Sequence, residues 1–108
     1  MEVRAGLEMF VEHGKPDVLW LVGELDLAGV ALVSQRLAEL DGDVEVDCSR
    51  LDFIDAAGIR VLLAAHGVCA ARGSRLVVVD PSRQVRRVLG LTSLDEVLLC
   101  GRRNGSAR

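Results

Sequence analysis

One stretch of this chain is apolar at every position, with Val, Leu, Trp, Leu and Val in succession from Val18 to Val22. A strand with one face in water alternates apolar and polar side chains. The unbroken stretch therefore predicts a strand that is covered on both faces, in the middle of a sheet. Residues 76–79, which carry a β-branched run, predict a second buried strand. Two such strands restrict the chain to folds that cover a central sheet.

Three further segments have the features of strands. Leu7, Met9 and Val11 alternate with Glu8 and Glu12, and a turn at residues 13–17 joins this segment to Val18. This pattern predicts a hairpin. Residues 44–48 alternate in the same way, and the apolar residues 97–99 predict a last strand.

Helical spacing fills the intervals between most of these strands. We expect three helices, the first capped by Asp26, the second capped by Asp55, and the third started by Pro81 and Ser82 and closed by Gly90. The resulting order is β-β-α-β-α-β-α-β. Because helices separate most of the strands, the chain is expected to be an α/β protein with a small, mixed, mostly parallel sheet.

The length and composition indicate one domain. The chain has 108 residues, of which 50% are hydrophobic and 27% are charged. We expect a domain over residues 1–100 and a short, basic, disordered tail over residues 101–108. The N-terminus lacks the pattern of a signal peptide, and no segment reaches the roughly 18 apolar residues of a membrane span. A cytoplasmic protein without stable membrane insertion is therefore expected.

Composition also excludes several classes of function. Aromatic residues make up 3% of the chain and the net charge is −3, which argues against nucleic-acid binding. Cys48, Cys69 and Cys100 are odd in number and lack C-x-x-C spacing, which argues against a disulfide framework or a zinc site. Buried free thiols are expected. A redox pair of Cys69 with Cys100 is the alternative.

The residues that usually carry catalysis do not form a recognisable site. The chain has no Gly-rich phosphate loop, and neither His13 nor His66 has a nucleophile and a carboxylate arranged around it in sequence. We expect His66 to be structural. Strand alternation and loop solvation account for the carboxylates at positions 45, 47, 52 and 55. No enzyme activity, metal site or cofactor is predicted.

One segment is specific enough to indicate a family. Residues 46–63 read VDCSRLDFIDAAGIRVLL, and they resemble the signature of the STAS domain family, in which a strand ending in Asp-Leu-Ser leads through Phe-Ile-Asp-Ser-Ser-Gly into a helix. Three other segments resemble the family in the same order along the chain: Gly-Glu-Leu-Asp at 23–26, Gly-Ser-Arg-Leu at 73–76, and the closing pattern from Val85 to Leu94.

The resemblance implies a single STAS domain with helices packed mainly on one face of the sheet. It also implies a bacterial anti-sigma factor antagonist, which binds an anti-sigma factor of the serine-kinase type and so regulates transcription. The partner surface carried over by position consists of Asp26, Asp55, Ala56, Ala57, Gly58 and Ile59. The residues are compatible with that role, because Gly58 allows another backbone to approach and free amides at an exposed helix start favour an acceptor.

The chain departs from the family at the regulatory position. The family's kinase modifies a Ser in the loop, whereas Ala56 and Ala57 have no hydroxyl. No phosphorylation is expected there, and Ser49 is expected to be a structural hydrogen-bonding residue rather than a substitute acceptor. Two alternatives are an accessory subunit of a transporter or lipid-trafficking complex and a small-molecule or nucleotide sensor. The sequence leaves the partner's identity and the oligomeric state open.

Overall fold

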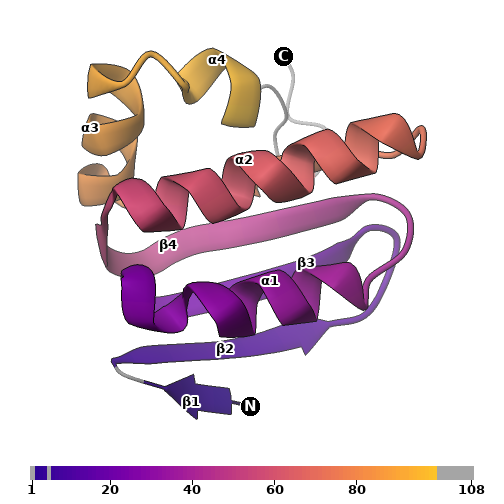
Figure 1. The fold of residues 1–108 in the computed structure, drawn as a ribbon, viewed down its shortest axis with the longest axis horizontal. Coiled ribbons are helices and arrows are strands. Elements are labelled where there is room, and N and C mark those ends of the chain that lie inside the picture. The colour runs from indigo at the N-terminus through magenta and orange to yellow at the C-terminus, as the bar shows by residue number, and fades with distance from the viewer. Residues whose placement is uncertain (1, 5, 100–108) are drawn as a thin grey trace.

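A single mixed sheet organises the computed structural model, which describes residues 2–4 and 6–99. Its strands lie side by side in chain order: β1 (Glu2–Arg4), β2 (Leu7–Glu12), β3 (Asp17–Leu25), β4 (Val44–Ile54) and β5 (Leu76–Val79). The β1–β2 and β2–β3 pairs are antiparallel, whereas β4 runs parallel to both β3 and β5 (Figure 1). The predicted hairpin, the parallel strands and the central place of β3 are confirmed.

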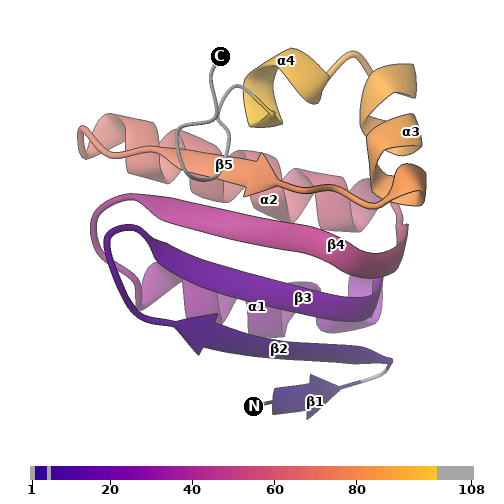
Figure 2. The same cartoon turned by 180° about the vertical axis from the view of Figure 1, so that it is seen from behind.

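The helices cover one face of this sheet. A 3₁₀ turn, η1 (Leu27–Gly29), and α1 (Val30–Ala38) connect β3 to β4, and α2 (Ala56–Ala71) connects β4 to β5. Seen from behind, β2, β3 and β4 lie in front of α1 and α2 (Figure 2). After β5 the chain continues through α3 (Arg83–Leu91) and α4 (Asp95–Leu98). The α/β class with helices mainly on one face is therefore confirmed.

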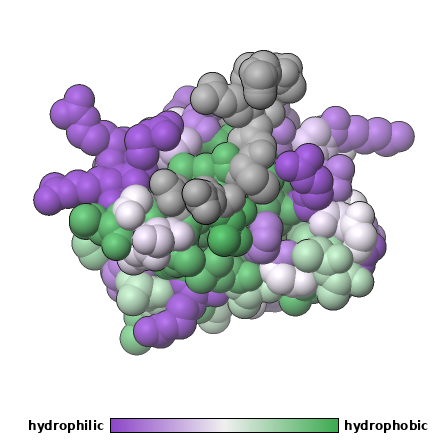
Figure 3. Space-filling model, turned by 90° about the horizontal axis from the view of Figure 1, so that it is seen from above, coloured by the Kyte–Doolittle hydropathy of each residue, from purple (hydrophilic) through white to green (hydrophobic). Residues whose placement is uncertain are grey.

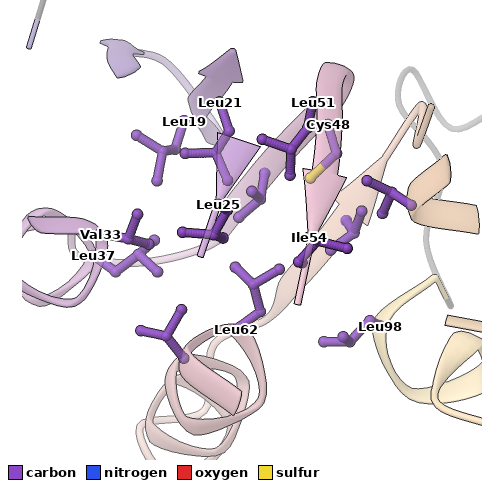
Figure 4. Close-up of a cluster of buried hydrophobic side chains, with 14 of the residues drawn as sticks. Leu19, Leu21, Leu25, Val33, Leu37, Cys48, Leu51, Ile54, Leu62 and Leu98 are labelled. Atoms are coloured by element: carbon purple, nitrogen blue, oxygen red, sulfur yellow. The ribbon is translucent and has the colours of Figure 1, made fainter. Parts of the chain in front are cut away.

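The core lies between the sheet and α1 and α2. Strand alternation directs Leu19 and Leu21 of β3 toward the helices, where they are buried beside Val33 and Leu37 of α1 (Figure 4). Leu62 of α2 joins the same cluster. Fully burying side chains of this size contributes about 2 kcal/mol each to the free energy of unfolding, so this layer is the main source of stability.

Gly23 lets the turn before β2 contact β3. Its φ angle is 101°, and a Cβ atom at this position would overlap the carbonyl oxygen of Gly6. That carbonyl accepts a hydrogen bond from the backbone N–H of Glu24 at 3.1 Å. Only glycine combines this backbone conformation with so close an approach.

The second face of β3 differs from the expectation that it is fully covered. Trp20 and Val22 point away from the helices and are half-buried. The ring of Phe10 stacks on Trp20 with centroids 5.7 Å apart, and the Arg50 guanidinium lies 5.5 Å from the Trp20 ring centroid. The apolar run from Val18 to Val22 therefore reflects side chains that partly cover one another on an open face of the sheet. It does not reflect a second layer of helices.

The C-terminal prediction was wrong in two respects. Residues 97–99 do not form a strand, because α4 ends at Leu98, which is buried in the core. A short apolar run has no periodicity that separates a strand from a helical turn. Gly90 does not close α3 either: the helix continues to Leu91, its C-cap residue is Thr92, and Ser93 after the cap has a φ angle of 60°. The strand β1 was not predicted at all.

Two other expectations concern parts of the chain beyond the core. Among the described helices, none combines the length and the apolar character that a membrane span requires. The tail expected at residues 101–108 lies outside the described residues.

The contrast between buried and exposed leucines gives a test of the fold. Leu21→Ala should lower the free energy of unfolding by about 2–5 kcal/mol, because Leu21 is fully buried and its loss leaves a cavity. Leu27→Ala is the matched control: Leu27 is 74% exposed, so the change should be within about 0.5 kcal/mol. Urea unfolding of both variants measures the difference, and equal effects would contradict the arrangement.

Candidate functional site

Two capped turns lie side by side where β3 and β4 end. Leu25, the last residue of β3, is the register partner of Ile54, the last residue of β4. The backbone N–H of Asp55 donates to the carbonyl of Leu25 at 3.2 Å. As a result, Asp26 and Asp55 begin their turns at the same end of the sheet.

Asp55 caps α2, as the sequence predicts, whereas Asp26 caps the 3₁₀ turn η1 that leads into α1 and not α1 itself, whose N-cap residue is Gly29. The Asp26 carboxylate accepts from the N–H of Ala28 at 3.0 Å, and the Asp55 carboxylate accepts from the N–H of Gly58 at 2.9 Å. A cap of this kind satisfies an amide that the helix itself leaves without a partner. The two hydrogen bonds fix the backbone on either side of the junction between β3 and β4.

Gly58 and Ile59 are buried, which corrects the expectation that they belong to an exposed helix start. A Cβ atom on Gly58 would lie 2.8 Å from the carbonyl oxygen of Leu25 and 2.8 Å from Cγ1 of Ile54. Gly58 does permit a close backbone approach, but the backbone is that of Leu25 in the same chain. Ile59 is 5% exposed and belongs to the core cluster.

The exposed part of this junction is apolar. Ala56 is exposed and Ala57 is half-buried, while Leu27 and Phe53 are 74% and 41% exposed. We call the following set the cap surface: Asp26, Leu27, Phe53, Asp55, Ala56 and Ala57. The sequence interpretation missed Leu27 and Phe53. The only signal for Phe53 was its place beside Ile54, because neighbouring residues of a strand face opposite ways.

Ser49 has a structural contact. Its hydroxyl donates to the Asp47 carboxylate at 2.6 Å, and its backbone N–H donates to the same oxygen at 2.9 Å. Asp47 is 2% exposed, a degree of burial that the simple alternation of β4 did not predict. The expected hydrogen-bonding role of Ser49 is therefore confirmed.

Cys48, Cys69 and His66 are not part of the cap surface. Cys48 is buried in the core, and this burial, with the nearby Asp47 charge, raises the pKa of its thiol well above the usual range. Cys69 is partly buried on α2, and desolvation raises its thiol pKa despite the nearby Arg72. Pairing of Cys69 with Cys100 stays a prediction, since Cys100 lies outside the described residues.

His66 has a structural contact. Its Nδ1 donates a hydrogen bond to the backbone carbonyl of Leu76, at a distance of 3.0 Å.

Comparison with known proteins identifies the fold. A family model described as "Mlab, STAS domain" matches residues 8–100. An anti-sigma factor antagonist from Mycobacterium paratuberculosis is similar in structure, with a TM-score of 0.75 and 23% identity over 85% of this chain and 82% of that chain. The anti-sigma factor antagonist SpoIIAA in its unphosphorylated form has a TM-score of 0.69 and 25% identity over 82% and 84%.

A phosphorylated form of SpoIIAA from Bacillus is also similar, with a TM-score of 0.66 and 21% identity over 83% of this chain and 86% of that chain. A search of curated proteins finds no significant match. The shared feature of these solved structures is the small α/β domain described above.

The packing of Gly58 makes a specific prediction about stability. Gly58→Ala should lower the free energy of unfolding by about 1–3 kcal/mol, because the new methyl group meets the backbone of Leu25. Gly90→Ala is the control, since Gly90 lies in a helix and a Cβ atom there meets nothing within 4 Å. Thermal and urea unfolding of both variants will show whether only the first is destabilised. A Gly58→Ala variant as stable as the parent chain would contradict the packing.

Proposed function

This chain is a member of the STAS domain family, and on that premise we propose that it is an anti-sigma factor antagonist-like protein that acts by binding rather than by catalysis. Its partner is an anti-sigma factor of the serine-kinase type. Two of the similar solved structures are named as anti-sigma factor antagonists, which supports this choice. The observation that carries the proposal is the exposure of two large apolar side chains, Leu27 and Phe53, each next to one of the two caps.

Exposed large apolar side chains support a binding role because water solvates them poorly. Leu27 follows the Asp26 cap directly, and Phe53 precedes the Asp55 cap by two residues. The hydrogen bonds of the two caps hold the backbone on which both side chains are mounted. A partner that covers them therefore meets a preformed surface and loses little conformational entropy on binding.

The charges around this pair suggest the character of the partner. Asp26 and Asp55 are half-buried, and Asp52 is exposed beside Phe53. Acidic side chains next to exposed apolar ones fit a partner surface that combines apolar and basic residues. Complementary charges would increase the association rate more than the final affinity.

Regulation through the loop at residues 56–57 is lost in this proposal. SpoIIAA has been observed in both unphosphorylated and phosphorylated forms. A phosphate at Ala56 or Ala57 would add close to two negative charges beside Asp55, but alanine has no acceptor oxygen. Ser49 is not a ready substitute, since its hydroxyl donates to Asp47. The antagonist is thus permanently in the state that binds.

Loss of both exposed apolar side chains should weaken partner binding strongly without unfolding the chain. Leu27→Glu combined with Phe53→Glu should weaken binding to the anti-sigma factor by roughly 30-fold or more, the effect of losing an interface hot spot. Leu91→Glu is the control, because Leu91 is equally apolar and 76% exposed but lies on α3. Isothermal titration calorimetry gives the affinities. Undiminished affinity of the double variant, or copurification with a membrane transporter complex instead, would contradict the proposal.

Incubation with the anti-sigma factor and ATP tests the missing switch. The parent chain should gain no phosphate by mass spectrometry, whereas Ala56→Ser or Ala57→Ser restores an acceptor hydroxyl on the cap surface. Neither change should affect folding much, because Asp55 already caps α2. If the parent chain gains a phosphate that weakens the complex, another residue has taken over the switch and the proposal is wrong.

A further inference from the structure

The face of the sheet that points away from α1 and α2 carries an excess of negative charge. Figure 2 shows this open face, with β2, β3 and β4 in front of the two helices. Alternation along a strand sends every second side chain to the same face. The open face therefore receives Glu8 and Glu12 from β2 and Glu45 and Asp47 from β4, with Arg50 of β4 among them. Such a surface attracts cations.

Trp20 lies on this open face between the acidic side chains. It is half-buried, it stacks on Phe10, and its indole N–H donates to the Glu12 carboxylate at 3.2 Å. The Arg50 guanidinium lies over its ring. Aromatic rings and carboxylates are the two kinds of group that bind a guanidinium best. The open face thus has the chemistry of a surface that binds arginine.

The acidic character continues to the edge of the sheet at β5. Asp47 is the register partner of Val79, and the exposed Asp80 follows β5 directly. At the other end of β5, the backbone N–H of Arg75 donates to the Asp43 carboxylate at 3.0 Å. A segment that crosses β5 onto the open face therefore meets carboxylates as soon as it arrives.

The chain leaves the described part of the structure beside β5. Leu98 is buried in the core, and α4 packs against β5, the last strand of the described sheet. The sequence continues for nine residues after Leu99, and residues 101–108 contain three arginines and no acidic residue. Nine extended residues span up to about 30 Å, whereas neighbouring strands lie about 5 Å apart. The basic segment 101–108 can therefore reach Trp20 on β3.

The helices near β5 do not attract this basic segment. Neither α2 nor α3 contains an acidic residue, and their exposed charges are all positive. Seen from the side of α4, hydrophobic surface fills the middle of the molecule and hydrophilic side chains project beside it (Figure 3). An apolar surface solvates a guanidinium poorly, and like charges repel. The exposed arginines of this region are Arg60, Arg83, Arg86 and Arg87, with Arg72 at the C-cap of α2.

We propose that residues 101–108 lie across the open face of the sheet, from β5 towards Trp20, with their arginines paired with its carboxylates. A single exposed ion pair is weak. This segment is tethered to the surface that it binds, so its effective concentration is high and several weak pairs act together. The proposal does not rest on the function proposed above.

The fluorescence of Trp20 reports on this contact, because Trp20 is the single tryptophan of the chain. Arg102→Glu combined with Arg103→Glu in the whole chain should reduce the docked population roughly tenfold, since two attractive pairs become repulsive. Acrylamide should then quench Trp20 more strongly than in the parent chain. Raising NaCl from about 0.1 M to about 1 M should have the same effect on the parent chain, because salt screens exposed pairs.

The matched control is Arg86→Glu combined with Arg87→Glu, which makes the same change of charge on α3 and should leave the quenching as in the parent. Equal quenching in the parent, in the Arg102→Glu, Arg103→Glu variant and at high salt would overturn the proposal. Quenching should also be independent of protein concentration from about 1 μM to about 100 μM. Shielding that grows with concentration would mean that the segment binds a second copy, which contradicts docking within one chain.

Zero-length cross-linking locates the segment. Lys15 is the single lysine of the chain, so Arg103→Lys adds one side-chain amine and keeps the charge. A carbodiimide should couple this amine, within the monomer, to Glu45, Asp47 or Asp80. Arg87→Lys on α3 is the control and should give none of these links by mass spectrometry. Links from position 103 to Asp95 or Glu96 alone would place the segment against α4 and overturn the proposal.

Discussion

The contact between Gly58 and the end of β3 sets the geometry of everything around it. Because Gly58 has no side chain, the first turn of α2 can lie against the Leu25 carbonyl and Ile54. The same carbonyl accepts the N–H of Asp55, so β3 and β4 end together and their two caps become neighbours. A methyl group at Gly58 would push α2 away from the sheet. The cap surface exists because this one contact is short.

Local patterns predicted the parts of the fold that depend on neighbouring residues. The alternation of β2, the caps at Asp26 and Asp55, and the end of α2 all rest on interactions a few residues apart, and they were recognised from the sequence. The last segment failed because its outcome depends on distant atoms. Leu98 is helical since that conformation brings it into the core, and no periodicity in three apolar residues records this.

The candidate site was only partly predictable for a related reason. Family resemblance located the junction of β3 and β4, and the caps followed from the residue types. Exposure did not follow, because it depends on which way each side chain points after the strand register is fixed. Gly58 and Ile59 were expected outside and are buried, whereas Leu27 and Phe53 were overlooked and are exposed. Only the folded structure shows that Gly58 and Ile59 are buried while Leu27 and Phe53 are exposed.

The two glycines of α2 show how far a residue type alone can be interpreted. Both weaken the helix by about 1 kcal/mol relative to alanine. Gly58 lies against Leu25 and Ile54, while a Cβ atom at Gly67 would meet nothing within 4 Å. A Cβ atom therefore fits at Gly67 and does not fit at Gly58 without a shift of the backbone of Leu25 or of Ile54. The same residue type is required where the helix meets the sheet and is replaceable where the helix meets water.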